Sequence, residues 1–556
     1  MLSTLQATKP AHTPASSPHD AHAWSLLDLL AVAVLALVAT VPRTANLLGL
    51  DPFVDEASWT DWALRLLEPG SPRTWLIPVL TDGRPPLFVW TIAPFGALVD
   101  NGIVAGRLAA SLAGVLSTVA LYGLGREIAS RTLGLCAALL WALSPFTVFF
   151  SRIAADDPLL TLLAILTAWA SVRLARQPTT TTGALCGVAL ALAVLAKTVG
   201  VLLAVAPPLA ILMLGRPREW QRYLRPLGAA FAAGLLVSSP LFLGIAPMLQ
   251  QVSLHTGSSR TDGAGLLADN LAVTAGWLET FAGWRFLALT GLGLILTLVV
   301  RQWALLYVAL LGAVVELALL DVTTPLFARY LLFGSFPFYL LAAYPVERVA
   351  ALAARPPRSW PLRPVIPAAL RYAAATLVLL AGLVVALGER AELAVGVVLA
   401  PATARIPGSE HVGYVENWYA TYGLGQVVGE LRARAKTGPV TVLVPPASRE
   451  VRVMVPYGLL RMYLRRDPAI RVVEAPSLWR AQDLREVERL ARGGPTYLVV
   501  NGSYTPGSGM PNDVAAYTRQ LERRLEQDVP KAREVLRIPR PSAPNWLSLY
   551  RLDGGE

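Results

Sequence analysis

Residues 104–131 read VAGRLAASLAGVLSTVALYGLGREIASR. Residues 104–124 form an apolar run, and the GREIASR that follows it carries two arginines. A helix needs roughly 20 apolar residues to cross the hydrocarbon core of a bilayer. This stretch therefore predicts a membrane-spanning helix followed by a basic loop.

The same pattern recurs along the chain, which has 556 residues, 54% of them hydrophobic and only 15% charged. That composition is typical of integral membrane proteins. The two cysteines, Cys136 and Cys186, lie inside apolar runs, so they support neither a disulfide framework nor a thiolate metal site. The predicted fold class is an α-helical polytopic membrane protein with eleven spans. We place them at residues 24–41, 104–124, 133–150, 158–175, 183–199, 201–214, 226–246, 284–300, 303–320, 328–345 and 366–387.

The distribution of charge orients these spans. With the amino terminus in the cytoplasm, the cytoplasmic loops carry 13 arginines and three acids, as the positive-inside rule requires. The net charge of +11 then reflects membrane topology, and we predict no nucleic-acid partner. The loop 44–103 and everything after residue 388 fall on the outer face. We expect a multi-pass protein of the plasma membrane, surrounded by membrane lipids.

The chain divides into three parts by composition. Residues 1–23 are polar and predict a disordered tail. Residues 24–388 form the membrane domain. Its first apolar run has a barely basic flank and many spans follow it, so we interpret it as a retained anchor rather than a signal peptide. Residues 389–556 predict an extracytoplasmic α/β domain. Its expected strands are PVTVLVPP, IRVVEAP, PTYLVVNG and WLSLYRL, and its expected helices lie near 413–436, 476–492 and 511–536.

The stretch DPFVDEASWTDW, residues 51–62, places four acids directly after the first span. A helical apolar face follows Asp55 and Glu56 at the spacing i, i+3, i+4, i+7 and i+8. It is made by Trp59, Trp62, Ala63, Leu66 and Leu67. The two acids can simply stabilise the start of this amphipathic helix. Local sequence leaves that interpretation open beside a functional one.

A resemblance to a known family favours the functional interpretation. The segment DEASWTDWALRLLEPG…DGRPPLFVW, from Asp55 to Trp90, resembles the first outer loop of glycosyltransferases with the C-type membrane fold. This group includes protein O-mannosyltransferases and lipid A aminoarabinose transferases. SRIAADDPLL, LAKTVG and ARYLLFGSFPF are similar to later family segments in the same order, so the resemblance covers roughly residues 25–345. The chain departs from the family at Trp59, where Tyr is common, and at Arg84, where Lys or His is common.

The resemblance implies the C-type fold for the membrane domain and transfer of a hexose or pentose, with inversion. The donor would be a sugar on a polyprenyl phosphate, and the acceptor a protein, a lipid or a glycan at the outer face. Asp55 and Glu56 match the family's acid pair, so the resemblance implies that they are catalytic. A carboxylate can orient or deprotonate the acceptor.

The departing lipid phosphate needs cations to stabilise it. Arg84 is the first candidate, although it can also be a solvated loop arginine. The other candidates are Lys197, Arg329 and Arg152, each at the outer end of a predicted span. A charge such as that of Lys197 is costly there unless it is paired.

Three further residues complete the predicted site. Asp157 matches a family acid, and Tyr330 follows Arg329 at the outer face. His255, in the long loop 247–283, is a candidate ligand for a divalent metal together with acids of the first loop, although no spacing motif marks it.

Two other classes of protein compete with the glycosyltransferase. A transporter or flippase of lipid-linked sugars would place polar residues at mid-membrane and show internal repeats. Here the ionisable residues gather at the outer ends of the spans. A membrane-anchored binding module would leave Asp55 and Arg84 without a role. We therefore expect a glycosyltransferase.

Overall fold

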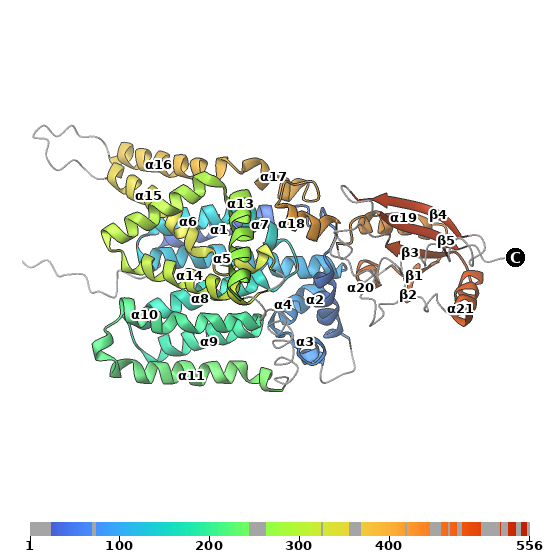
Figure 1. The fold of residues 1–556 in the computed structure, drawn as a ribbon, viewed down its shortest axis with the longest axis horizontal. Helices are drawn as coiled ribbons and strands as arrows, with labels where there is room; N and C mark the ends of the chain where they lie inside the picture. Colours follow the sequence, from blue (N-terminus) through green and yellow to red (C-terminus); the bar gives the residue numbers. More distant parts are fainter. Residues whose placement is uncertain are drawn as a thin grey trace, which may run out of the picture.

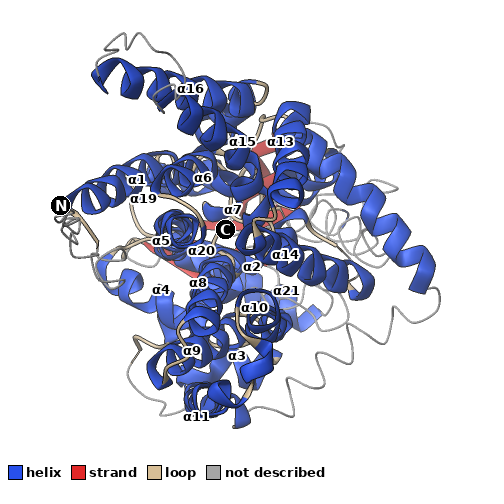
Figure 2. Ribbon diagram, turned by 90° about the vertical axis from the view of Figure 1, so that its left-hand side faces the viewer, coloured by secondary structure: helices blue, strands red, loops and turns tan. Residues whose placement is uncertain are grey.

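The protein is described by a computed structural model that covers residues 24–68, 74–243, 263–323, 326–354, 368–416, 420–444, 457–464, 467–474, 481–501, 523, 532–540 and 546–552. The predicted tail, residues 1–23, lies outside these ranges. A helical body and a smaller domain with a sheet follow one another along the long axis of the molecule (Figure 1). Seen along that axis, α11 and α16 lie at the periphery of the helical body (Figure 2).

The body and the segments that join it to the sheet domain are built from helices. The α-helices of its first half are α1 (Leu26–Thr44), α2 (Val54–Arg65), α3 (Ile77–Asp82), α4 (Leu87–Leu98), α5 (Gly102–Ile128), α6 (Arg131–Leu143), α7 (Pro145–Ser151), α8 (Asp157–Arg176), α9 (Thr180–Ala196), α10 (Ala206–Leu214) and α11 (Gln221–Phe242). Those of its second half are α13 (Gly263–Val300), α14 (Trp303–Val322), α15 (Phe336–Ala354), α16 (Ala368–Gly388), α17 (Ala391–Leu399) and α18 (Gly408–His411). Short 3₁₀ or π segments are η2 (Thr74–Leu76), η3 (Thr198–Val205), η4 (Pro217–Glu219), η5 (Ala328–Leu331) and η6 (Val412–Glu416).

Among the described residues, seven helices are long and apolar enough to cross a membrane, or eight if the bent pair α6 and α7 is one span. Each of the eleven predicted spans coincides with helical structure, but the count of eleven is not confirmed. The helices α9 and the η3–α10 segment are shorter than a full span, and α7 turns 61° away from α6. The prediction that residues 247–283 form a loop is wrong from Gly263 onward. There α13 begins, and its helix breaks at Gly283, whose φ of +77° favours glycine.

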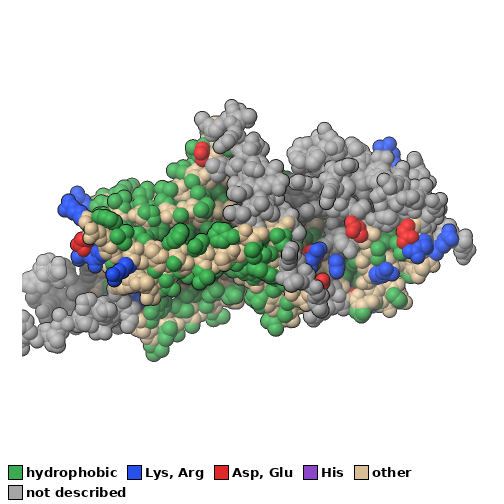
Figure 3. Space-filling view, turned by 90° about the horizontal axis from the view of Figure 1, so that it is seen from below, with side chains coloured by type: hydrophobic (Ala, Val, Ile, Leu, Met, Phe, Trp, Pro, Cys, Tyr) green, Lys and Arg blue, Asp and Glu red, His purple; other side chains and the backbone are tan. Residues whose placement is uncertain are grey.

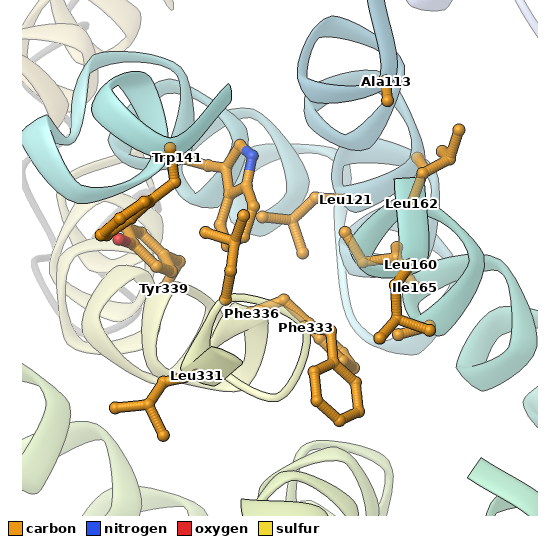
Figure 4. Close-up of a cluster of buried hydrophobic side chains, with 14 of the residues drawn as sticks. Ala113, Leu121, Trp141, Leu160, Leu162, Ile165, Leu331, Phe333, Phe336 and Tyr339 are labelled. Carbon is orange, nitrogen blue, oxygen red and sulfur yellow. The ribbon is translucent and has the colours of Figure 1, made fainter. Parts of the chain in front are cut away.

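The body packs around one apolar core. Side chains from α5, α6, α8 and α15 meet there, including Leu121, Trp141, Ile165 and Phe336 (Figure 4). Outside, hydrophobic side chains cover the helical body, while charged ones gather at its far end and on the sheet domain (Figure 3). An apolar exterior of this kind suits a lipid environment.

The predicted amphipathic helix of the first outer loop is α2. Its Trp59 is buried and packs edge-on against Trp62 and Phe88, with ring centroids 5.5 and 5.6 Å away. Ala63 is buried one turn later. The apolar face of α2 therefore lies against α4 and α5, and this contact fixes the acids at the start of the helix.

The C-terminal domain contains a five-stranded sheet in the order β2-β1-β3-β5-β4. Its strands are β1 (Val440–Val444), β2 (Ile470–Glu474), β3 (Thr496–Asn501), β4 (Ala532–Pro539) and β5 (Trp546–Leu552). Its helices are α19 (Leu424–Ala435), α20 (Tyr457–Tyr463) and α21 (Ala481–Arg492). The strands β2, β1 and β3 are parallel, while β5 runs antiparallel to β3 and β4.

The four predicted strands correspond to β1, β2, β3 and β5. The prediction of a helix over residues 511–536 is wrong at its end, because Ala532–Pro539 forms the edge strand β4. Leu64 and Ile103 of the membrane domain lie in the same apolar cluster as the sheet. The C-terminal domain is therefore packed against the loop 44–103. Helix α2 of that loop contacts α20 of the C-terminal domain, and the two helices lie side by side in Figure 1.

Candidate active site between the two domains

The start of α2 is held by a buried ion pair. Glu56 accepts hydrogen bonds from Arg107 Nε and Nη2 of α5, both at 2.8 Å, and the two side chains are each only 1% exposed. Glu56 also accepts from the backbone N–H groups of Phe53, at 2.8 Å, and Ala154, at 2.9 Å. Both carboxylate oxygens are thus fully used. Glu56 anchors the first loop to the bundle and thereby places its neighbour Asp55.

Asp55 lies between two arginines. Its Oδ2 accepts a hydrogen bond from Arg329 Nη2 at 2.9 Å, and its Oδ1 lies 3.8 Å from Arg84 Nη2. The guanidinium of Arg84 also lies over the ring of Trp59, 5.3 Å from its centroid. The structure therefore brings together Asp55, Arg84 and Arg329, three residues that the sequence predicts for the site.

A second ion-paired group adjoins the first. Lys197, at the end of α9, donates to Asp156 Oδ1 at 3.0 Å and to Asp157 Oδ1 at 2.6 Å. Its ammonium lies 4.4 Å from the centroid of the Tyr330 ring. Arg329 Nε lies 3.6 Å from Asp157 Oδ2 and so joins the two groups. Opposite charges held together at the ends of the spans offset the cost of placing them near the membrane.

Arg329 is the centre of this network, and its third contact comes from η6, which leads from the helical body into the C-terminal domain. Its Nη1 donates to the Tyr414 hydroxyl of η6 at 2.9 Å. The rings of Phe53 and Phe327 lie 5.0 and 4.7 Å from its guanidinium carbon, measured to their centroids. Burial raises the pKa of the Tyr414 phenol, although the charge of Arg329 acts in the opposite direction. The hydroxyl therefore stays protonated and serves Arg329 as a neutral acceptor.

The charged side chains of the site differ in their exposure to solvent. The side chains of Arg84 and Asp55 are 37% and 29% exposed, whereas those of Arg329 and Asp157 are 6% and 3% exposed. An incoming molecule can thus touch Asp55 and Arg84 directly. The buried pair behind them holds Asp55 in place.

Glu410 of α18 is a further buried acid beside Arg329. Its Oε1 accepts from the backbone N–H of Ala328 at 3.0 Å. In the part of the chain that the structure describes, its Oε2 accepts no hydrogen bond. Burial raises the pKa of the Glu410 carboxyl to about 7, although the Ala328 N–H and the charge of Arg329 act in the opposite direction.

Two predicted site residues are committed to contacts that support the fold. Arg152 donates to the backbone carbonyls of Pro42, Ala45 and Asn46 at 2.5 to 2.9 Å, so it ties the chain after α7 to the end of α1. Glu56 is committed to Arg107, as described above. Both placements favour structural roles, and the predicted chemical roles of the two residues stay predictions.

A metal site does not emerge from the described residues. Among them, no group of three or more His, Cys, Asp or Glu lies close enough to hold a metal ion. Asp55, Asp156 and Asp157 are each paired with arginine or lysine, so they offer a metal no uncommitted set of ligands. His255 lies outside the described residues, and the divalent metal stays a prediction.

Four residues of the site were missed by the sequence analysis. An arginine inside the apolar run 104–124 was an available signal for Arg107. Asp156 directly precedes the predicted Asp157 and, like it, accepts a hydrogen bond from Lys197. Glu410 and Tyr414 lie in a segment without a membrane or strand pattern, and no local signal marks them.

The fold and the site define a class of protein. It is a polytopic helical membrane protein with a C-terminal α/β domain, as the sequence predicts, and it carries an ion-paired, partly accessible carboxylate between its two domains. Residues 83–244 match the model of the family described as dolichyl-phosphate-mannose-protein mannosyltransferase. This match confirms, for that part of the chain, the resemblance to the protein mannosyltransferases. It includes Arg84, Asp157 and Lys197, but neither Asp55 nor Arg329.

The chain is also similar to several solved structures. ArnT from Cupriavidus metallidurans, solved in the apo state and bound to undecaprenyl phosphate, is 16% identical with a TM-score of 0.47. In the apo comparison, 95% of this chain and 99% of that chain are covered. The Archaeoglobus fulgidus oligosaccharyltransferase is 12% identical over 85% of this chain and 68% of its own, with a TM-score of 0.45. The S. cerevisiae Pmt1–Pmt2 complex is 17% identical over 41% of this chain and 35% of that chain, with a TM-score of 0.33. No curated protein sequence matches the chain.

Proposed function

We propose that this protein is a glycosyltransferase that moves a hexose or pentose from a polyprenyl-phosphate donor to an acceptor at the outer face of the plasma membrane. The acceptor is a protein, a lipid or a glycan, and the C-terminal domain lies on the same outer face. The observation that carries the proposal is Asp55, an accessible carboxylate that Arg329 holds in place beside the more exposed Arg84.

The reaction needs one base and one cationic site. The acceptor oxygen attacks the anomeric carbon, its proton passes to Asp55, and the bond between that carbon and the lipid phosphate breaks. Attack from the opposite side inverts the anomeric centre. A single carboxylate serves this displacement, whereas a glycosidase uses two.

Arg84 suits the departing phosphate. It lies 3.8 Å from Asp55, farther than the 2.9 Å hydrogen bond between Arg329 and Asp55. A phosphate can therefore take over this guanidinium while Asp55 remains bonded to Arg329. Charge-assisted, bidentate contacts with phosphate are a strength of arginine. Lys197 already donates to two carboxylates, so we give it and Arg329 an assisting role.

The test begins with the product. Mass spectrometry of surface glycans, lipids and proteins from cells with and without the protein identifies the transferred group. The same measurement is then made in cells that carry Asp55→Asn. We expect product formation to fall at least about 10²-fold, the low end for loss of a general base.

Asp61→Asn is the matched control, because Asp61 lies on the same helix and forms an exposed ion pair with Arg65 one turn later. Product formation by this control and the thermal stability of both purified variants should stay near wild type. Near-normal product formation by Asp55→Asn would overturn the proposed function.

A further inference from the structure

We propose that Tyr414 of η6, the segment that leads from the helical body into the C-terminal domain, is a positioning residue of the active site, acting on Asp55 through Arg329. The C-terminal domain, which begins a few residues later and contacts the same loop, then supports the catalytic site. This inference rests on the proposed function, because it assigns Asp55 the role of the base.

Three contacts fix the guanidinium of Arg329, and they come from three distant parts of the chain. Nη2 donates to Asp55, Nη1 donates to Tyr414, and Nε lies against Asp157. Each nitrogen of the planar fork thus has its own partner. A planar group held by two hydrogen bonds and an ion pair cannot rotate without losing one of these contacts. The orientation that Asp55 meets therefore depends on Tyr414.

Tyr414 is itself held rigidly. It is 2% exposed, and its ring packs against Phe53, Phe149 and Phe150, with centroids 5.1, 5.5 and 6.2 Å away. Phe53 also lies over the guanidinium of Arg329. The aromatic packing places the hydroxyl, and the hydroxyl places the arginine.

The segment after Tyr414 is fastened to the residues just before Asp55. Phe53 forms an antiparallel β-bridge with Ala420, and the Thr421 hydroxyl donates to the carbonyl of Pro52 at 2.6 Å. These contacts lie within three positions of Asp55 in sequence. They make the C-terminal domain a direct support of the catalytic loop.

The Asp51 carboxylate forms a second connection between the loop before α2 and the start of α19. Asp51 accepts from the backbone N–H groups of Gly423 at 2.7 Å and Gly425 at 2.9 Å, at the start of α19. A carboxylate at a helix N-terminus is favoured by the exposed N–H groups and by the helix dipole. Gly423 has a φ of +93°, which allows the chain to turn its N–H toward Asp51.

Removing the Tyr414 hydroxyl leaves a buried N–H of Arg329 without its acceptor. The guanidinium then turns toward the two carboxylates, and Asp55 moves with it. Hydrogen bonds to charged groups are strong, and small displacements of a catalytic group are costly in rate. We expect Tyr414→Phe to lower the transfer rate by about 10- to 100-fold.

The experiment is a double-mutant cycle on the full-length protein in membrane vesicles that contain its own donor. The four proteins are wild type, Tyr414→Phe, Arg329→Lys and the double variant. If Tyr414 acts through Arg329, the tyrosine substitution has little further effect once Arg329 is replaced. A merely structural role would give independent, additive losses. Affinity for undecaprenyl phosphate, the probe for the phosphate site, should fall less than the transfer rate in Tyr414→Phe, because Arg84 is intact and Arg329 only assists at the phosphate.

The control is Tyr339→Phe, which removes another buried hydroxyl, bonded to Ser144 at 2.8 Å in the core of the bundle. Its transfer rate should stay near wild type. If Tyr414→Phe does not fold, 4-aminophenylalanine at position 414 keeps the ring and offers Arg329 only a weak aniline acceptor, and we expect a smaller loss of rate.

The outcomes separate the two proposals. Loss of transfer in Asp55→Asn combined with a wild-type rate in folded Tyr414→Phe, or with additive losses in the cycle, overturns this inference alone. Wild-type transfer by Asp55→Asn overturns the proposed function itself.

Discussion

The division of labour between the two neighbouring acids can be tested at Glu56. Glu56→Gln keeps the size of the side chain but removes the charge that faces Arg107. The wild-type carboxylate accepts four hydrogen bonds, two of them from the guanidinium. Because a glutamine has only one acceptor oxygen, its NH₂ group must face one or more of these donors.

The expected loss of stability follows from burial. Both partners of the pair are 1% exposed, so Arg107 would keep a buried charge without its counterion. Breaking such a pair by changing one partner costs roughly 3–5 kcal/mol. The Asp55 side chain is 29% exposed, so we expect Asp55→Asn to cost less than about 1 kcal/mol.

Denaturant unfolding of the purified variants in detergent measures the difference, and transfer per folded molecule is measured beside it. The double variant Glu56→Leu with Arg107→Leu should recover part of the lost stability, because it leaves no unpaired charge. Recovery is only partial, since the N–H groups of Phe53 and Ala154 lose their acceptor. If Glu56→Gln is as stable as wild type but inactive, the anchoring role is refuted and Glu56 belongs to the chemistry.

Two further predictions concern the cations and the buried acid of the site. Arg84→Ala should weaken binding of undecaprenyl phosphate about 10- to 100-fold, as expected for the loss of a charge-assisted contact, with little change in the melting temperature; unchanged affinity would remove Arg84 from the phosphate site. Glu410 has a pKa of about 7 in the folded protein against 4.5 ordinarily, so the folded state binds its proton more tightly. The stability that this proton contributes is fully present below about pH 4.5 and is lost as the pH rises through about 7, by up to about 3 kcal/mol. Glu410→Gln should abolish that part of the pH dependence in melts recorded between pH 4.5 and 8; an unchanged profile would exclude Glu410 as its source.

The membrane fold follows from the sequence wherever burial in lipid dictates composition. A run such as 104–124 has no other stable environment, so its helix α5 is predicted well. The lengths of the helices are harder to predict than their positions. Helices such as α9 and α10 can be shorter than a full span when the surrounding protein covers their ends. The edge strand β4 was missed since its residues favour a helix locally, and pairing with β5 overrides that preference.

The residues of the site are easier to predict than their partners. Lys197 and Arg329 stand out as charges at the ends of apolar runs, while Asp55 and Arg84 match the first-loop motif of the family that the chain resembles. Their pairing does not stand out, because Asp55 and Arg329 are 274 positions apart in the chain. Arg152 has the same local signature as Arg329 but binds backbone carbonyls. Only the three-dimensional structure distinguishes an arginine that pairs with a carboxylate from one that donates to the backbone carbonyls at the end of a helix.

The contacts that join residues 51–53 to residues 420–425 also set an order of assembly during synthesis. The contact of Thr421 with Pro52 spans 369 positions, so α2 is translated long before its partner segment. Until η6 and α19 dock, Arg329 lacks Tyr414, and Asp51 lacks the N–H groups that it binds. Under the proposed function, the nascent protein therefore stays inactive until the C-terminal domain packs against the loop that contains Asp55.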